Sequence, residues 1–163
     1  MKRALKPDGL MLAVMPGGET LRELRFALTQ AETEIYGGAS PRALPFADVR
    51  AAGALLQRTG FALPVTDVET LTVRYDSLFA LMADLRGMGA QNALHARSRL
   101  PVSRRFFQRA AEIYAESFSD ADGRVRATFQ FVSLSGWAPH SSQQKPLKPG
   151  SAKVSLADFL SRV

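Results

Sequence analysis

Apolar residues along this chain fall into stretches whose spacing predicts three strands. Residues 10–15 form a near-continuous apolar run, which is typical of a strand buried on both faces inside an α/β sheet. Residues 65–75 alternate in polarity and are rich in β-branched side chains, which predicts a second strand. Residues 125–137 alternate in the same way and predict a third strand.

Four other stretches carry apolar side chains at helical spacing, at about residues 19–36, 46–59, 77–85 and 103–118. Thr20 with Glu23 three residues on matches a capping box, which predicts how the first helix begins. Asp76 or Ser77 is expected to cap the third helix. The order is strand, helix, helix, strand, helix, helix, strand. It predicts an α/β layer whose sheet is thin for so much helix.

Composition limits the class of protein. The 163 residues are 46% hydrophobic and 22% charged, which predicts one compact unit over residues 1–137 and a mobile tail over residues 138–163. With no cysteine, the chain has no disulfide framework, thiolate metal site or cysteine nucleophile. His95 and His140 each stand alone, so we expect no metal site. The longest apolar run is too short for a membrane span, and we expect a soluble, cytoplasmic protein.

The charge is basic and uneven. There are 21 Lys and Arg residues against 15 Asp and Glu residues, a net charge of +6. Four arginines lie within nine residues of sequence: Arg97, Arg99, Arg104 and Arg105. This cluster is either a solvated face or a patch that binds an acidic carrier or assembly partner. It lacks interleaved aromatic residues, so we expect no nucleic-acid binding.

Several motifs, taken in order, resemble one known family. They are Leu-Lys-Pro-Asp-Gly at 5–9, Gly-Gly-Glu-Thr-Leu-Arg-Glu-Leu-Arg at 17–25, Ala-Glu-Thr-Glu at 31–34, Arg-Thr-Gly-Phe at 58–61, and Asp-Leu-Arg-Gly-Met-Gly at 84–89 followed by Asn92. The chain resembles class I S-adenosylmethionine-dependent methyltransferases over about residues 3–137. It is similar to the branch that holds the malonyl-carrier-protein methyltransferases of biotin synthesis and the arginine-hydroxylating assembly factor of respiratory complex I. The resemblance to the assembly-factor group is the greater.

The resemblance implies a fold. The family has a seven-stranded Rossmann-like sheet in the order 3-2-1-4-5-7-6 with the last strand antiparallel, and this chain corresponds to strands five, six and seven. The S-adenosylmethionine site of the intact parent uses a glycine-rich loop and an acidic residue on the first two strands. Gly87-Met88-Gly89 follows a predicted helix and no strand, so we interpret it as a helix stop. We expect no cofactor and no catalysis in this chain alone.

The resemblance also implies substrate-side residues. Glu19, Arg22 and Arg25 follow the fifth strand, at the mouth of the family's cofactor pocket. They either meet a substrate or form a solvated first helical turn. Arg86 and Asn92 flank the glycine pair and either anchor a lid over a substrate or, for Arg86, complement a helix dipole. No residue of the chain is expected to be catalytic.

Two classes of function stay open. The intact parent is expected to modify a protein substrate, either by methylating the carboxylate of an acyl-carrier thioester or by hydroxylating an arginine. The alternative is a stand-alone interaction module without catalysis. Without a fourth strand, the edge at residues 10–15 has unpaired backbone groups, so we expect a homodimer through that sheet edge.

Overall fold

The computed structural model describes residues 1–44, 46–95, 97, 98, 101–145, 150, 151 and 160. Its elements in chain order are η1 (Lys2–Ala4), β1 (Leu10–Pro16), α1 (Arg22–Tyr36), α2 (Val49–Arg58), β2 (Ala62–Tyr75), α3 (Leu78–Gly87), α4 (Arg104–Phe118) and β3 (Val125–Trp137). Apart from the short η1 turn, this is the order that the apolar pattern predicted. The α/β class is therefore confirmed.

The sheet has the strand order β1-β3-β2, with β3 antiparallel to both neighbours. Leu10 lies opposite Trp137 and Pro16 opposite Phe131, so β1 pairs with the second half of β3. The longer β2 pairs with the whole of β3 and has one irregularity between Ala62 and Val65. This is the predicted arrangement of strands five, seven and six, with the last strand of the sequence antiparallel in the middle.

Three helices begin at side-chain caps. Ser77 accepts a hydrogen bond from the Ala80 N–H at the start of α3, and Ser103 accepts one from the Phe106 N–H at the start of α4, both at 3.2 Å. Of the two residues considered for α3, Ser77 is therefore the cap. Asp48 caps α2, which begins a few residues later than the apolar pattern predicted.

The capping box predicted for α1 is wrong. Leu21, with φ of 56°, is the residue at the cap position and makes no side-chain cap bond. Thr20 Oγ1 instead donates to the Gln130 carbonyl at 2.8 Å and accepts from the Gln130 N–H at 3.0 Å. Glu23 accepts from the Thr128 N–H at 3.0 Å. Both side chains extend the hydrogen bonding of β3 beyond the point where β1 ends, so tertiary partners replace the local ones.

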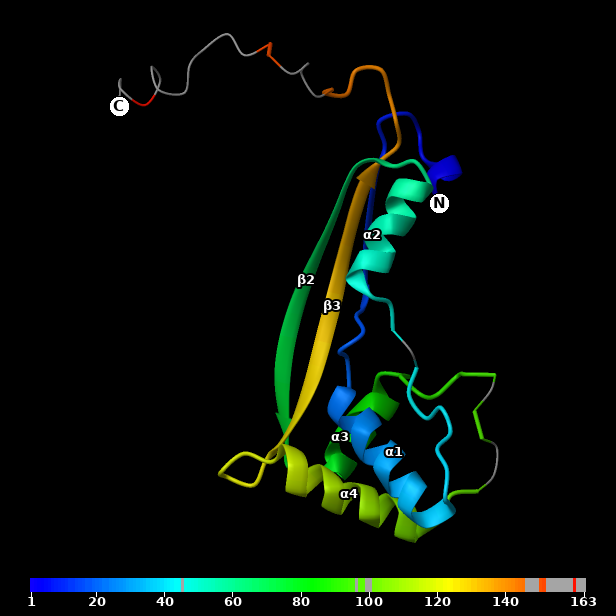
Figure 1. Cartoon of the computed structure of the whole chain (residues 1–163), viewed down its shortest axis with the longest axis vertical. Coiled ribbons are helices and arrows are strands. Elements are labelled where there is room, and N and C mark those ends of the chain that lie inside the picture. The colour runs from blue at the N-terminus through cyan, green and yellow to red at the C-terminus, as the bar shows by residue number, and fades with distance from the viewer. Residues whose placement is uncertain (45, 96, 99–100, 146–149, 152–159, 161–163) are drawn as a thin grey trace.

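Two apolar clusters hold the chain together, one at each end of the long sheet (Figure 1). The helical cluster joins α1, α3 and α4 to the first residues of β3, and Phe106, Tyr114, Leu81 and Leu78 are at most 1% exposed. The sheet cluster lies under α2, where Ala52, Leu56 and Phe61 pack against Val132 and Leu134. Figure 1 shows α2 along the sheet, away from the other helices.

The expectation that β1 is buried on both faces is wrong for this chain. Met11, Ala13 and Met15 pack against the sheet cluster, but Leu12 is 72% exposed and Val14 is 68% exposed. The apolar pattern predicted the strand correctly, yet no described element covers the second face of β1. We call the surface formed by Leu12, Val14 and, on the other side of β3, Val65 of β2 the open face. As predicted, β1 is also an edge strand.

The chain after β3 first returns to the start of the molecule. The Ala138 N–H donates to the Gly9 carbonyl at 2.8 Å, and the Asp8 N–H donates to the Ala138 carbonyl at 3.1 Å. Gln143 Nε2 donates to Asp8 at 2.8 Å. These bonds continue the β1–β3 pairing into the turn before β1. Most of the predicted mobile tail lies outside the described residues.

Candidate functional site

A mostly apolar pocket lies where β1 ends and the helical cluster begins. Its volume is about 360 Å³. It is lined by Pro16, Thr20, Leu21, Leu24, Arg42, Ala43, Leu44, Phe46, Leu85, Met88, Ala90, Gln91, Asn92, Phe129 and Phe131. This volume and lining suit one extended side chain or a small acyl group, with a few polar groups to orient it. We refer to it as the junction pocket.

The turn between β1 and α1 forms one wall of the junction pocket, and Gln130 holds it in place. The Gly17 N–H donates to the Gln130 carbonyl at 2.7 Å, and the Glu19 N–H donates to Gln130 Oε1 at 3.2 Å. A Cβ atom at Gly17 would lie 2.5 Å from Gln130 Oε1. Residue 17 must therefore be glycine for the Gln130 side chain to brace the turn.

This turn is the one glycine-bearing strand-to-helix connection among the described residues, so it is where a cofactor cradle would be sought. Four of its backbone amides are already engaged. Besides Gly17 and Glu19, the Thr20 N–H donates to Gly17 at 3.0 Å and the Leu21 N–H to Thr128 at 2.7 Å. A nucleotide-type cofactor needs free backbone donors and close approach at such a turn. The residues present do not fit S-adenosylmethionine.

The other glycine motif ends a helix. α3 runs to Gly87, the Met88 N–H donates to the Asp84 carbonyl at 2.9 Å, and Gly89 has φ of 72°. These are the features of a helix C-terminus, where glycine adopts the left-handed conformation without strain. The interpretation of Gly87-Met88-Gly89 as a helix stop is confirmed.

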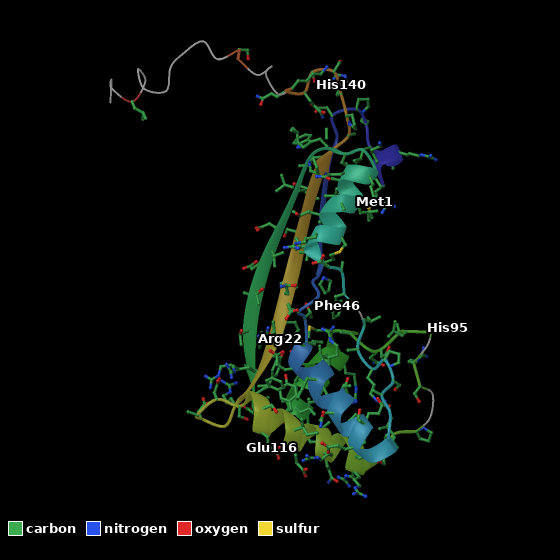
Figure 2. The ribbon with its side chains drawn as sticks, viewed as in Figure 1. Met1, Arg22, Phe46, His95, Glu116 and His140 are labelled. Atoms are coloured by element: carbon green, nitrogen blue, oxygen red, sulfur yellow. The ribbon has the colours of Figure 1, made fainter. Side chains whose placement is uncertain are left out.

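Glu19, Arg22 and Arg25 lie together beside the junction pocket, in a shallow hollow of about 430 Å³ on the outer side of α1. Glu19 and Arg22 form an exposed ion pair at 3.2 Å. Arg25 Nη2 donates to the Gly18 and Thr20 carbonyls, both at 2.9 Å, so this side chain fixes the turn. Figure 2 shows Arg22 at the start of α1, where the sheet meets the helices.

A second hollow, of about 270 Å³, lies between the first and the junction pocket, since Arg25 lines both hollows and Arg42 lines the second hollow and the pocket. The three depressions are therefore neighbours on the surface. A polypeptide lying in the hollows could place one side chain in the pocket. Figure 2 shows Phe46, a lining residue, on the connection between α1 and α2.

Arg42 is a site residue that the sequence reasoning missed. Its Nη2 pairs with Glu32 Oε1 at 2.6 Å, and its guanidinium lies 4.6 Å from the centre of the Phe106 ring. Burial would raise the pKa of Glu32, but hydrogen bonds from Arg42 and Ser40 outweigh it and lower that pKa. Glu32 interrupts the apolar side of α1, which was the available signal for a buried partner.

Asn92 and Arg86 lie on different sides of α3 and its C-terminal connection. Asn92 lines the junction pocket, and its Nδ2 donates to the Pro41 carbonyl at 2.9 Å, which ties together the two connections that form the pocket wall. Arg86 instead lines a groove between α3 and α4. The structure therefore brings Asn92 close to the pocket and does not bring Arg86 there.

The arginine cluster does not act as one unit in the described residues. Arg97 donates to the Leu94 carbonyl at 2.9 Å in the connection before α4, and Arg104 and Arg105 occupy the first turn of α4. Arg99 lies outside the described residues. Of the three described members, Arg104 lines the same groove as Arg86.

The parts of the chain that the structure describes offer no three-residue metal-ligand group of His, Asp or Glu. His95 and His140 lie far apart (Figure 2). Within the same described residues, no helix is both long and apolar enough to cross a membrane.

Comparison with known proteins identifies relatives. No protein-family model matches the chain. The mitochondrial arginine-hydroxylase NDUFAF5 of Dictyostelium discoideum is 45% identical over 160 residues, which are 98% of this chain and 36% of that protein. The protein of the same name from Homo sapiens is 44% identical over 95% of this chain and 45% of its own length. The malonyl-[acyl-carrier protein] O-methyltransferase of Methylovorus sp. is 36% identical over 100% of this chain and 49% of its own length.

These similarities, with the strand order, show that the chain is homologous to methyltransferase-fold proteins. The branch suggested by the sequence motifs is confirmed, with higher identity to the arginine hydroxylases than to the carrier-protein methyltransferases. The chain spans less than half the length of these curated relatives.

Proposed function

We propose that this chain forms the substrate side of an S-adenosylmethionine-dependent methyltransferase-fold protein and is inactive alone. The observation that carries the proposal is a substrate-sized pocket beside a turn in which the amides of Gly17, Glu19, Thr20 and Leu21 are engaged within the chain. In this proposal the chain supplies the substrate pocket, and the cofactor site needs residues from elsewhere in the complete protein. The uncovered edge and the open face of β1 are the natural attachment for the strands that would supply them.

Arginine hydroxylation of a protein is the activity that we propose for the complete protein; it is a two-electron oxidation, so the complete protein would also have to use an oxidant such as molecular oxygen. The relatives with the higher identity are arginine hydroxylases. The apolar walls of the junction pocket, including Leu24, Phe129 and Phe131, suit the methylene stem of an arginine. The two adjacent hollows give the neighbouring peptide a surface to lie on.

Methylation of an acyl-carrier carboxylate is the second candidate, supported by the carrier-protein methyltransferases among the relatives. It would need a free cation in the pocket. Arg42 is the charged residue in the pocket lining, and its guanidinium is already paired with Glu32 at 2.6 Å. This pairing leaves little free charge for a carboxylate substrate, so we rank methylation below hydroxylation.

Calorimetric titration with S-adenosylmethionine tests the separation of the two sites. We expect no heat of binding for the 163-residue chain. If the reading frame continues upstream with a glycine-rich strand-turn pattern, the joined protein is expected to bind the cofactor. Tight binding by the chain alone would contradict the proposal. An upstream frame without such a pattern would favour the stand-alone interaction module.

Mass spectrometry of candidate protein substrates distinguishes the two reactions. Hydroxylation adds one oxygen to an arginine-containing peptide, whereas methylation adds a methyl group to a carboxyl group. An active joined protein that adds only methyl groups would replace the hydroxylation proposal with the methylation one. A cytoplasmic location stays a prediction from the cysteine-free composition, and cell fractionation would test it.

A further inference from the structure

A groove between α3 and α4 lies on the side of α3 that faces away from the junction pocket. Its volume is about 460 Å³, and it is lined by Phe79, Met82, Arg86, Arg104, Phe107 and Gln108. Phe79 is 50% exposed although its neighbours Leu78 and Leu81 are buried in the helical cluster. The groove therefore combines an exposed aromatic side chain with a guanidinium from each helix. Such a combination marks protein–protein anchors more often than ordinary surface.

The two arginines of the groove have no carboxylate partner among the described residues. Other arginines nearby have such a partner. Arg109, on α4 like Arg104, pairs with Glu34 at 2.7 Å and Glu112 at 3.1 Å. Arg124 pairs with Asp76 at 3.2 Å. Acidic residues lie close to these helices, yet neither Arg86, in the last turn of α3, nor Arg104, in the first turn of α4, forms an ion pair among the described residues.

The charge pattern of α4 runs against its own dipole. Arg104 and Arg105 occupy the positive N-terminal end, where the first turn contains no acidic residue. Glu116 lies near the negative C-terminal end, and the last turn contains no basic residue (Figure 2). Stability alone would favour the reverse arrangement. Glu116 has a partner in Arg109, at 3.8 Å, but Arg104 breaks the rule without an ion-pair partner among the described residues, and such residues are expected where a surface is used for binding.

We propose that this groove docks an acidic amphipathic helix of a partner protein. An apolar side chain of the helix would insert between Phe79 and Phe107, and carboxylates on either side of it would meet Arg86 and Arg104. Carboxylates suit these arginines because guanidinium groups bind them in a bidentate fashion. The apolar floor of the groove distinguishes this partner from nucleic acid, which would need stacking platforms along a basic track. The proposal does not depend on the junction pocket or on a cofactor.

The test is fluorescence anisotropy of a labelled synthetic helix that carries glutamates and leucines at helical spacing, titrated with the 163-residue chain. We expect micromolar binding that weakens about tenfold between ~50 mM and ~300 mM salt. The double variant Arg86→Gln/Arg104→Gln should lose about tenfold in affinity and most of the salt dependence. A peptide with every glutamate replaced by glutamine should bind the unchanged chain as weakly as the original peptide binds the double variant.

The matched control is Arg50→Gln/Arg58→Gln, which removes two exposed arginines of α2. This variant should change the affinity less than about twofold, because α2 is remote from the groove. Equal losses in both double variants would mean attraction to net charge alone and would overturn the proposal. So would undetectable binding by the unchanged chain, or full displacement of the peptide by an oligonucleotide or by anionic vesicles.

Discussion

The helical cluster and the sheet cluster differ in how completely they are covered. In the first, α1, α3 and α4 enclose side chains such as Tyr114 and Phe106 that are 0% exposed. In the second, α2 covers one face of the sheet while Leu12 and Val14 remain mostly exposed on the other. Among the described residues, the helical cluster is therefore covered on all sides, whereas the sheet is covered on one face only. The junction pocket lies at the boundary between them.

The largest expected effect comes from the same substitution made in both regions. Leu81→Ala removes a side chain that is 0% exposed in the helical cluster and should lower the free energy of unfolding by about 3–5 kcal/mol, since it leaves a cavity. Leu12→Ala on the open face should cost less than ~0.5 kcal/mol. Urea denaturation followed by circular dichroism measures both. Similar losses would mean that the two regions are covered alike.

Within the sheet cluster, Leu56→Ala serves as the control for burial under α2. Leu56 is 5% exposed, so its truncation should cost about 2 kcal/mol or more. A cost as small as that of Leu12→Ala would mean that α2 does not hold the sheet in solution.

A smaller effect is expected at Glu23, which ties α1 to Thr128 of β3. Burial would raise the pKa of Glu23, but hydrogen bonds from Thr128 and Arg22 outweigh it and lower that pKa. Glu23→Gln should therefore cost about 1–3 kcal/mol at neutral pH. The stabilisation is present above the pKa of the unfolded chain, about 4.3, and is lost as the pH falls through the lower pKa of the folded protein.

Unfolding of the unchanged protein and the Glu23→Gln variant from about pH 7 to pH 3 measures this dependence. The exposed Glu19→Gln is the control and should change stability little at any pH. A difference between the Glu23 variant and the unchanged protein that grows toward low pH would contradict the assigned direction of the pKa shift.

The smallest effect on stability, and the clearest on association, is expected at the open face. The unpaired β1 edge and the exposed Leu12 and Val14 predict a homodimer at high concentration. Leu12→Glu/Val14→Glu should return it to a monomer by light scattering with under ~0.5 kcal/mol change in stability. Leu55→Lys, on the exposed side of α2, should leave association unchanged. A monomeric unchanged protein would exclude the dimer.

The sequence predicted the elements well because their signals are local. Alternation identified β2 and β3, and the helical stretches were placed to within a few residues. The Thr20 and Glu23 pattern failed because its partners lie on β3, 110 and 105 residues away. The prediction that β1 is buried on both faces failed for a related reason. An apolar strand favours burial, but the elements that bury it lie elsewhere in the sequence.

The site was predictable only in part. The turn after β1 and Asn92 were found from motifs, and both line or brace the junction pocket. Arg42 was missed because its partners, Glu32 and Phe106, are tertiary neighbours. Arg86 was placed with Asn92 by proximity in sequence, but consecutive positions on a helix face different directions. Leu85 lines the pocket, whereas Arg86 lines the groove.

The central position of β3 has a consequence for how the chain folds. β1 and β2 precede β3 in the sequence, and neither pairs with the other. During synthesis neither strand can pair with β3 until residues 125–137 have left the ribosome. Such distant pairing makes folding slow. The junction pocket gains its Phe129 and Phe131 wall only at that moment, so a ligand held there would slow unfolding without speeding folding.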